Sequence, residues 1–331
     1  MLPRVSAHVE HWPLAAPFRI SRGVKSEAVV VVAEVHGDGG VGRGESVPYA
    51  RNGETPAGVI TQIETLSARL SGELTRAQLS SLLPAGAARN AVDCALWDLE
   101  ARRARRSVAE MLDQQEPGVL TTAVTVVLDR PAAMAEAARR IAEAPLIKVK
   151  VDATEPRAAI EAVASAAPGA RLIVDPNESW SFELLERLQP FLRDARVVLL
   201  EQPLPASADE RLEGLTPLVP VCADESVHTL ADLERVRSRY QVVNIKLDKA
   251  GGLTEALRVR SAARERGLGI MVGCMVCTSL GIAPALHLAA GADFVDLDGP
   301  WWLTRDREGG ARITCGTLQP PARNLWGGGV G

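Results

Sequence analysis

Short apolar runs alternate with longer amphipathic stretches along the chain from about residue 121 onward. Runs of this kind, rich in β-branched residues, are typical of buried strands, and the stretches between them have the length of helices. Eight runs are predicted to be strands: Ala123–Val127, Leu146–Val151, Leu172–Asp175, Val197–Glu201, Val219–Ala223, Val242–Leu247, Ile270–Gly273 and Phe294–Leu297. Alternating strands and helices favour an α/β fold, and eight strands predict a (β/α)8 barrel. We expect a helix after each strand except the last.

The first third of the chain has a different pattern. Strands are predicted between about residues 3 and 46, with Ala28–Val35 the clearest of them. Two helices are predicted to begin near Glu54 and near Ala87. In the second helix, apolar residues at i, i+3, i+4 and i+7 mark one buried face. Strands followed by helices indicate an α+β domain.

These patterns divide the chain into two domains. We predict an N-terminal α+β capping domain over residues 1–118 and a catalytic barrel over residues 119–302. The remaining tail, residues 303–331, is rich in Gly and Pro. It is predicted to return to the capping domain and complete it.

Composition and charge exclude several classes of protein. The chain has 331 residues and a net charge of -4, which argues against nucleic acid as a partner. Its one basic cluster, Arg102–Arg106, is expected to close a helix. No apolar run approaches the roughly 20 residues needed to cross a membrane, and the first residues lack the apolar core of a signal peptide. Five irregularly spaced cysteines favour the reducing cytoplasm.

Candidate chemistry lies at the ends of the predicted strands. Asp175, Glu201 and Asp224 close the third, fourth and fifth strands of the barrel, and active sites of such barrels gather at the C-terminal ends of strands. Each residue alone fits equally well as the N-cap of a following helix. Three neighbouring carboxylates would repel one another unless a cation held them, and oxygen ligands select a hard divalent ion. We therefore predict one Mg²⁺ per subunit at these residues.

Three lysines flank this predicted metal site. Lys148 and Lys150 lie two residues apart in the second strand and so project from one face, while Lys246 ends the sixth strand. Lysines at a strand end that reach water are the alternative interpretation, but buried lysines need a partner. Crowding would lower the pKa of each ammonium and make one lysine a usable base. Bases on both faces of a metal-bound enediolate would racemise or epimerise a substrate by proton transfer.

The combined motifs resemble those of the enolase superfamily, in its muconate lactonizing branch, over nearly the whole chain. The motifs are Lys148-Val149-Lys150, Asp175-Pro176-Asn177, Glu201-Gln202-Pro203, Ala223-Asp224-Glu225-Ser226 and Asn244-Ile245-Lys246-Leu247-Asp248-Lys249-Ala250-Gly251-Gly252. The resemblance implies an enolase-like modified TIM barrel with a capping domain. It also implies that Lys150 and Lys246 are the two bases, and that Lys148 is an electrostatic partner that binds the substrate carboxylate.

Further stretches are similar to those of dipeptide epimerases. In that family an Asp-x-Asp motif, here Asp296 and Asp298, meets the free α-ammonium group of the substrate, and Cys277-Thr278 stands where many members have Glu-Ser. A loop arginine, here Arg22, faces an acidic substrate side chain, and Thr125 is a weaker candidate for contact with the substrate carboxylate. The resemblance thus implies a Mg²⁺-dependent isomerase that converts L-Ala-L-Glu to L-Ala-D-Glu in peptidoglycan peptide metabolism.

Other reactions on the same scaffold stay open. They are those of o-succinylbenzoate synthase, a cycloisomerase and an N-acylamino acid racemase. None of them needs two aspartates for a free ammonium group, so Asp296 and Asp298 favour the epimerase. A metal-binding or regulatory protein without catalysis is a further alternative, which the intact set of lysines and carboxylates disfavours. The sequence does not fix the preferred second residue, and it allows a homo-oligomer.

Overall fold

The structure, a computed structural model, describes residues 4–70 and 72–328. The extreme ends of the predicted capping domain and tail lie outside these residues. Within the described ranges, the strands form an antiparallel sheet of β1, β2 and β3, an eight-stranded parallel sheet, and a small sheet of β13, β14 and β4. None of the helices in these ranges is long and apolar enough to span a membrane.

The eight-stranded sheet forms the predicted barrel. Its strands follow chain order from β5 to β12, and the two ends of the sheet meet where Ala123 N donates to Val295 O at 2.8 Å. The strands are β5 (Val124–Val126), β6 (Leu146–Lys150), β7 (Arg171–Asp175), β8 (Val197–Glu201), β9 (Val221–Ala223), β10 (Val242–Ile245), β11 (Gly269–Gly273) and β12 (Phe294–Asp296). All eight predicted strands are present. Residues such as Ile147, Leu200 and Val272 are fully buried, which explains the continuous apolar runs.

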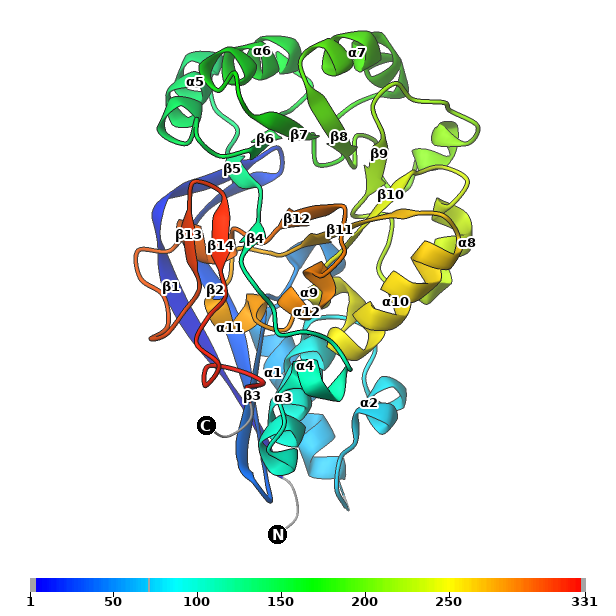
Figure 1. Ribbon diagram of the computed structural model, residues 1–331. Coiled ribbons are helices and arrows are strands. Elements are labelled where there is room, and N and C mark those ends of the chain that lie inside the picture. The colour runs from blue at the N-terminus through cyan, green and yellow to red at the C-terminus, as the bar shows by residue number, and fades with distance from the viewer. Residues whose placement is uncertain (1–3, 71, 329–331) are drawn as a thin grey trace.

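Helices cover the outside of the barrel, most visibly α5, α6 and α7 (Figure 1). The elements are α5 (Pro131–Arg140), α6 (Pro156–Ala166), α7 (Phe182–Asp194), η2 (Asp209–Leu212), η3 (Leu230–Asp232), α8 (Leu233–Val236), α9 (Leu247–Ala250), α10 (Leu253–Glu265), α11 (Ser279–Ile282), α12 (Leu286–Ala289) and η4 (Gly299–Trp302). The expectation of a helix after each of the first seven strands is wrong after β8, where the 3₁₀ helix η2 follows instead. Four prolines between β8 and β9 remove the backbone donors that a longer helix needs: Pro203, Pro205, Pro217 and Pro220.

The capping domain combines the antiparallel sheet with several helices. β1 (Arg4–Ile20) pairs with β2 (Gly23–Gly37), which pairs with β3 (Gly40–Ser46). The helical elements are η1 (Ala50–Asn52), α1 (Pro56–Arg69), α2 (Arg76–Leu82), α3 (Ala87–Ala104) and α4 (Val108–Met111). The two predicted helices are α1 and α3. The sequence reasoning missed α2 because Leu79 is its one buried residue, so it shows no apolar period, and a capping box sets its start.

β3 packs closely on α3. A Cβ atom at Gly44 would lie 2.2 Å from Ala91 O, and one at Gly42 would lie 2.1 Å from Ala95 O, so glycine is required at both positions. This approach carries the end of β3, including Glu45, into the junction between the capping domain and the barrel, where Glu45 is buried.

The C-terminal tail runs back along the molecule. β13 (Arg312–Thr314) and β14 (Thr317–Gln319) form a sheet with β4 (Leu120–Thr121). Further along the tail, Trp326 Nε1 donates to Cys94 O in α3 at 3.0 Å. These contacts support a tail that returns to the capping domain. The division of the chain at residues 118 and 302 stays a prediction.

Candidate active site

Five neighbouring strands carry charged side chains at their C-terminal ends. From β6 to β10 these are, in order, Lys148 and Lys150, Asp175, Glu201, Asp224 and Lys246. All of them are buried. Because the strands are consecutive in the sheet, lysines flank three carboxylates, and the residues predicted from the strand ends meet at one end of the barrel.

Lys148 stands among three carboxylates. Its Nζ lies 2.7 Å from Glu201 Oε2, 2.8 Å from Asp296 Oδ2 and 3.2 Å from Asp175 Oδ2. Burial alone would lower the pKa of Lys148, but Asp296, Glu201 and Asp175 together raise it well above its usual value. The expectation that crowded ammonium groups lower this pKa is therefore wrong, because carboxylates surround the ammonium group of Lys148.

Lys150 and Lys246 approach the carboxylates from opposite sides. Lys150 Nζ lies 2.5 Å from Asp175 Oδ2, and Lys246 Nζ lies 2.7 Å from Asp224 Oδ2. Burial opposes the charge of Lys246, yet Asp224 and Glu201 raise its pKa. Since three carboxylate-bearing strands separate β6 from β10, the two amino groups face the same space from two directions.

The three carboxylates differ in pKa because their neighbours differ. Burial favours the neutral acid at each of them. At Asp175, Lys150 and Lys148 outweigh burial and lower the pKa to about 2. At Asp224, burial is the largest single influence, but Lys246, Lys249 and Lys148 together outweigh it and hold the pKa well below its usual value. At Glu201, burial and the nearby Asp175 raise the pKa to about 7, so its negative charge is the least compensated of the three.

The chemistry of the carboxylate set fits a hard divalent cation. In the described part of the chain, no three acidic, imidazole or thiol groups already stand together as a ligand set, because Lys148 lies between Asp175 and Glu201. Glu201 Oε2 is buried without a hydrogen-bond partner in that same part, although Lys148 Nζ is 2.7 Å away, so this contact is an ion pair with poor hydrogen-bond geometry. Such an oxygen among carboxylates is one that Mg²⁺ would satisfy.

The predicted ammonium-binding aspartates lie where the barrel closes. Asp296 Oδ2 accepts from Lys148, while its Oδ1 is buried without a hydrogen-bond partner among the described residues. Asp298 Oδ2 accepts from the backbone N of Thr125 at 2.8 Å and from Trp302 Nε1 at 3.3 Å. Burial and Asp296 raise the pKa of Asp298 to about 6. Thr125 therefore orients Asp298 through its backbone, and its contact with a substrate carboxylate stays a prediction.

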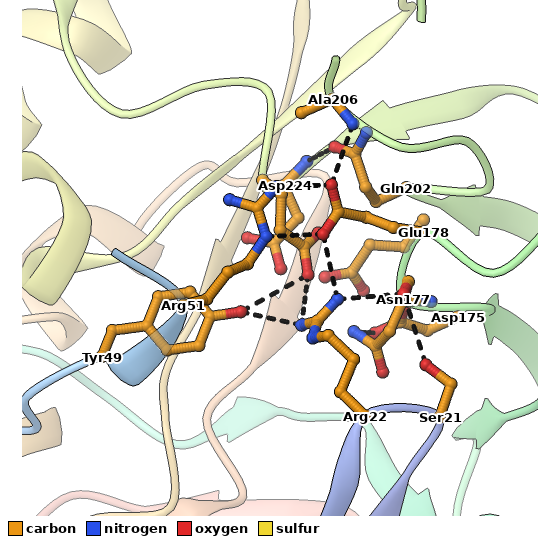
Figure 2. Close-up of polar contacts among 12 residues, drawn as sticks. Ser21, Arg22, Tyr49, Arg51, Asp175, Asn177, Glu178, Gln202, Ala206 and Asp224 are labelled. Carbon is orange, nitrogen blue, oxygen red and sulfur yellow. Dashed lines mark hydrogen bonds and ion pairs between the residues drawn. The ribbon is translucent and has the colours of Figure 1, made fainter. Parts of the chain in front are cut away.

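Arg22 lies in the turn between β1 and β2 (Figure 2). It reaches the end of the barrel that carries the charged strand ends, which we call the barrel mouth. Its Nη1 donates to Asn177 O at 2.9 Å and to Glu178 Oε2 at 3.2 Å. Its Nη2 donates to Tyr49 OH at 2.8 Å and to Glu225 Oε1 at 2.6 Å. Burial disfavours the guanidinium charge, but Glu225 raises the pKa of Arg22 overall. All four Nη hydrogens thus have protein acceptors, which leaves Nε–H for a further one.

Several residues at the site received no role from the sequence, although Glu225 and Lys249 lie within the quoted motifs. Lys249 Nζ lies 2.5 Å from Asp224 Oδ1, and both Glu178 and Glu225 bind Arg22. For lysine a signal was available: the chain has five lysines, and four of them lie buried at the barrel mouth. For Glu178 no comparable signal exists, because glutamate is common throughout the sequence.

Comparison with known proteins assigns the chain to a family. Residues 4–113 match the family "Mandelate racemase / muconate lactonizing enzyme, N-terminal domain", and residues 132–330 match "Enolase C-terminal domain-like". The chain therefore belongs to the enolase superfamily, in its mandelate racemase and muconate lactonizing branch. With epimerases and racemases as its relatives, it is an isomerase.

Two individual relatives are similar to this chain over most of its length. The L-Ala-D/L-Glu epimerase of Escherichia coli (strain K12) is 48% identical over 316 residues, which are 95% of this chain and 98% of the epimerase. The N-acetyl-D-glutamate racemase of Pseudoalteromonas sp. is 46% identical over 289 residues, which are 87% of this chain and 91% of the racemase.

A solved structure is also similar. It is an enolase family member from Agrobacterium tumefaciens with homology to dipeptide epimerases, holding sodium and L-Ala-L-Glu with an ordered loop. It is 43% identical, superposes with a TM-score of 0.95, and covers 98% of this chain and 100% of its own.

Proposed function

We propose that this isomerase epimerises the C-terminal residue of a dipeptide and that its preferred reaction converts L-Ala-L-Glu to L-Ala-D-Glu. The observation that carries the proposal is the order lysine, three carboxylates, lysine along five neighbouring strands. The similarity to the Escherichia coli epimerase and to the Agrobacterium protein with its bound L-Ala-L-Glu supports this choice of substrate.

In this proposal Lys150 and Lys246 are the two catalytic bases. One neutral amine takes the α-proton from one face, and the ammonium of the other lysine gives a proton to the opposite face. Because one proton leaves and one is returned, substrate and product have the same number of protons. The reverse reaction exchanges the roles of the two lysines. Lys148, held between Asp175 and Glu201, would bind the substrate carboxylate as a fixed positive charge.

Asp175, Glu201 and Asp224 would hold one Mg²⁺ per subunit. When bound, the ion supplies positive charge that stabilises the negative charge developing on the substrate carboxylate. Asn244 Nδ2 donates to Glu201 Oε1 at 2.8 Å and Asn177 N donates to Asp175 Oδ1 at 2.9 Å. These bonds orient two of the proposed ligands.

Asp296 and Asp298 would bind the free ammonium group of the dipeptide. Oδ1 of Asp296 lacks a hydrogen-bond partner among the described residues, and both hydrogen bonds of Asp298 fall on Oδ2. The two carboxyls therefore keep oxygen atoms available for a cation. An ammonium group bound there, on a residue other than the reacting one, would make the substrate a dipeptide and not a single amino acid.

Racemisation of an N-acylated glutamate is the second candidate, because the Pseudoalteromonas racemase is nearly as similar to this chain as the epimerase is. Both reactions use the same lysines and the same reacting residue. They differ at the amino end, where an N-acyl group is neutral and a dipeptide carries an ammonium.

The test compares L-Ala-L-Glu, N-acetyl-L-Ala-L-Glu and N-acetyl-L-Glu in D₂O with Mg²⁺, following the α-proton and the product configuration by NMR. We expect the free dipeptide to have the highest kcat/KM, and Asp296→Asn to lose most of this preference. Asp293→Asn, an exposed aspartate beside β12, is the matched control. If N-acetyl-L-Glu is the best substrate, the racemase replaces the epimerase.

The setting of the reaction is part of the same proposal. All five cysteines are free thiols, which supports the cytoplasm as the location. A product with a D-Glu residue is suited to peptidoglycan peptide metabolism, and assembly into a homo-oligomer stays a prediction that size-exclusion chromatography with light scattering can test.

A further inference from the structure

One side chain, Glu178, ties the loops of the capping domain to the barrel. Its Oε2 accepts from Arg22 Nη1 at 3.2 Å and from Arg51 Nε at 2.5 Å. Its Oε1 accepts from Arg51 Nη2 at 2.5 Å and from Ala206 N at 2.8 Å. Figure 2 shows Arg22 and Arg51 reaching Glu178 from two different segments. Glu178 thereby joins the β1–β2 turn, the η1 segment and the loop after β8.

The backbone that carries Glu178 is unusual. Asn177 and Glu178 follow each other with φ of 46° and 69°, a left-handed conformation that non-glycine residues rarely adopt. Asn177 N donates to Asp175 Oδ1 at 2.9 Å, and Glu178 N donates to Gln202 O at 2.8 Å. A strained conformation of this kind persists where the surroundings enforce it. Here the enforced turn directs the Glu178 carboxylate toward the two arginines, three residues after the proposed metal ligand Asp175.

The two arginines depend on Glu178 to different degrees. Arg22 also contacts Asn177 O, Tyr49 and Glu225. For Arg51, the side-chain hydrogen bonds found in the described structure both go to Glu178. Both arginine side chains remain partly exposed, each with 29% of its surface accessible, whereas the side chain of Glu178 has 11%. Glu178 is therefore the less exposed anchor, and the arginines are the groups that a ligand can more easily reach.

We infer that Glu178 is a specificity-determining positioning residue, which holds Arg22 and Arg51 over the barrel mouth so that their charge selects a substrate with an acidic second side chain. This inference rests on the proposed function and adds to it the residue behind its selectivity. Glu178 acts through the arginines and does not touch the reacting atoms. The opposite role, an internal carboxylate that competes with the substrate for the arginines, is disfavoured because the backbone N of Ala206 also binds Glu178 Oε1 and fixes the carboxylate in place.

The kinetic test uses L-Ala-L-Glu and the isosteric neutral dipeptide L-Ala-L-Gln. For Glu178→Ala we expect KM for L-Ala-L-Glu to rise on the order of tenfold with little change in kcat, since a charge-assisted contact is lost that acts on binding. KM for L-Ala-L-Gln should stay close to its original value. Glu178→Gln keeps one acceptor oxygen and should fall between. Glu183→Gln, which removes an exposed carboxylate paired with Arg211, is the matched control and should leave KM for both substrates unchanged.

A lower KM for L-Ala-L-Glu in Glu178→Ala would overturn the inference in favour of competition, and equal losses of kcat on both dipeptides would reduce Glu178 to a structural role. A second readout needs no turnover. Amide hydrogen exchange over residues 20–24 and 49–53 should be faster in Glu178→Ala than in the original protein and in Glu183→Gln. Unchanged exchange would contradict the anchoring. If the original protein epimerises neither dipeptide, the proposed function fails while the exchange experiment still decides whether Glu178 holds the loops.

Discussion

Two buried polar clusters in this protein differ in how completely their groups are paired. At the junction of the capping domain, the barrel and the tail, Glu45 Oε1 accepts from Thr278 N at 2.8 Å, and Glu45 Oε2 accepts from Arg307 Nη2 at 2.8 Å and from Thr278 Oγ1. At the barrel mouth, buried oxygen atoms lack hydrogen-bond partners among the described residues. These are Asn177 Oδ1, Glu201 Oε2, Glu225 Oε2, Asn244 Oδ1 and Asp296 Oδ1.

The difference separates a structural use of buried charge from a functional one. A cluster whose carboxylate is paired at both oxygens holds elements together and leaves that carboxylate nothing to bind. Buried polar atoms without partners are destabilising, and they persist where a bound group completes them. The junction also gives a role to Thr278, which the sequence left open: its amide and hydroxyl both bind Glu45. Substitutions in each cluster test this difference.

The largest effect is expected from removing the cation that the carboxylates at the barrel mouth would bind. Treatment with EDTA should abolish epimerisation, and added Mg²⁺ should restore it. Asp224→Asn removes one hard ligand and should lose both activity and the rise in melting temperature on addition of Mg²⁺. Asp194→Asn, at an exposed aspartate, serves as the control. Full activity in the stripped protein or in Asp224→Asn would show that the mouth is not a metal site.

A large but smaller effect is expected from the proposed bases. Lys246→Ala should lower the rate of epimerisation by about 10²–10⁴-fold, the range for a general base. Exchange of the α-proton with D₂O should persist for one epimer, through Lys150. The measurement is NMR of each epimer in D₂O, with Arg258→Ala on the barrel exterior as control. Interconversion at the original rate in Lys246→Ala would eliminate the two-base mechanism.

At the junction the expected effect falls on stability instead of activity. Arg307→Met leaves Glu45 buried without its cation, and should lower the free energy of unfolding by about 3 kcal/mol. Urea denaturation measures this change, and kcat of the folded protein should stay the same. Thr278→Ser, which keeps the hydroxyl, is the matched control. A variant that is stable but inactive would mean that this cluster takes part in the chemistry after all.

The smallest effect concerns Asp93, which joins α3 to α10 through Thr254. Burial outweighs the hydrogen bonds from Thr254 and raises the pKa of Asp93 to about 6. Because the folded protein then binds a proton more tightly than the unfolded chain, this contribution to stability is present below the unfolded pKa of about 3.9 and is lost as pH rises through about 6.

Relative to Asp93→Asn, which does not titrate, the original protein should therefore lose about 2 kcal/mol of stability between pH 4 and pH 7. Urea denaturation at several pH values measures the difference between the two curves. Parallel curves for the two proteins would show that the carboxyl of Asp93 is not perturbed in the folded state.

The barrel was predictable from the sequence because its strands are continuous apolar runs, and the mouth because Asp175, Glu201, Asp224 and the lysines end those runs. Contacts between distant segments were not. Glu178 lies 127 positions from Arg51, and Glu45 lies 233 positions from Thr278, and no period in the sequence connects them. The raised pKa of Lys148 was likewise not predictable, because Asp296, the carboxylate that raises it most, comes from the last strand of the barrel.

The barrel closes partly through side chains. Between its first and last strands, Thr122 Oγ1 accepts from Leu297 N at 2.8 Å and Asp298 Oδ2 accepts from Thr125 N at 2.8 Å. A side-chain contact can be exchanged by single substitutions, whereas a ladder of backbone bonds cannot. The contacts at this seam can thus change by single substitutions. Under the proposed function, descendants of this enzyme can acquire new amino-terminal substrates there while the lysine and carboxylate strands stay untouched.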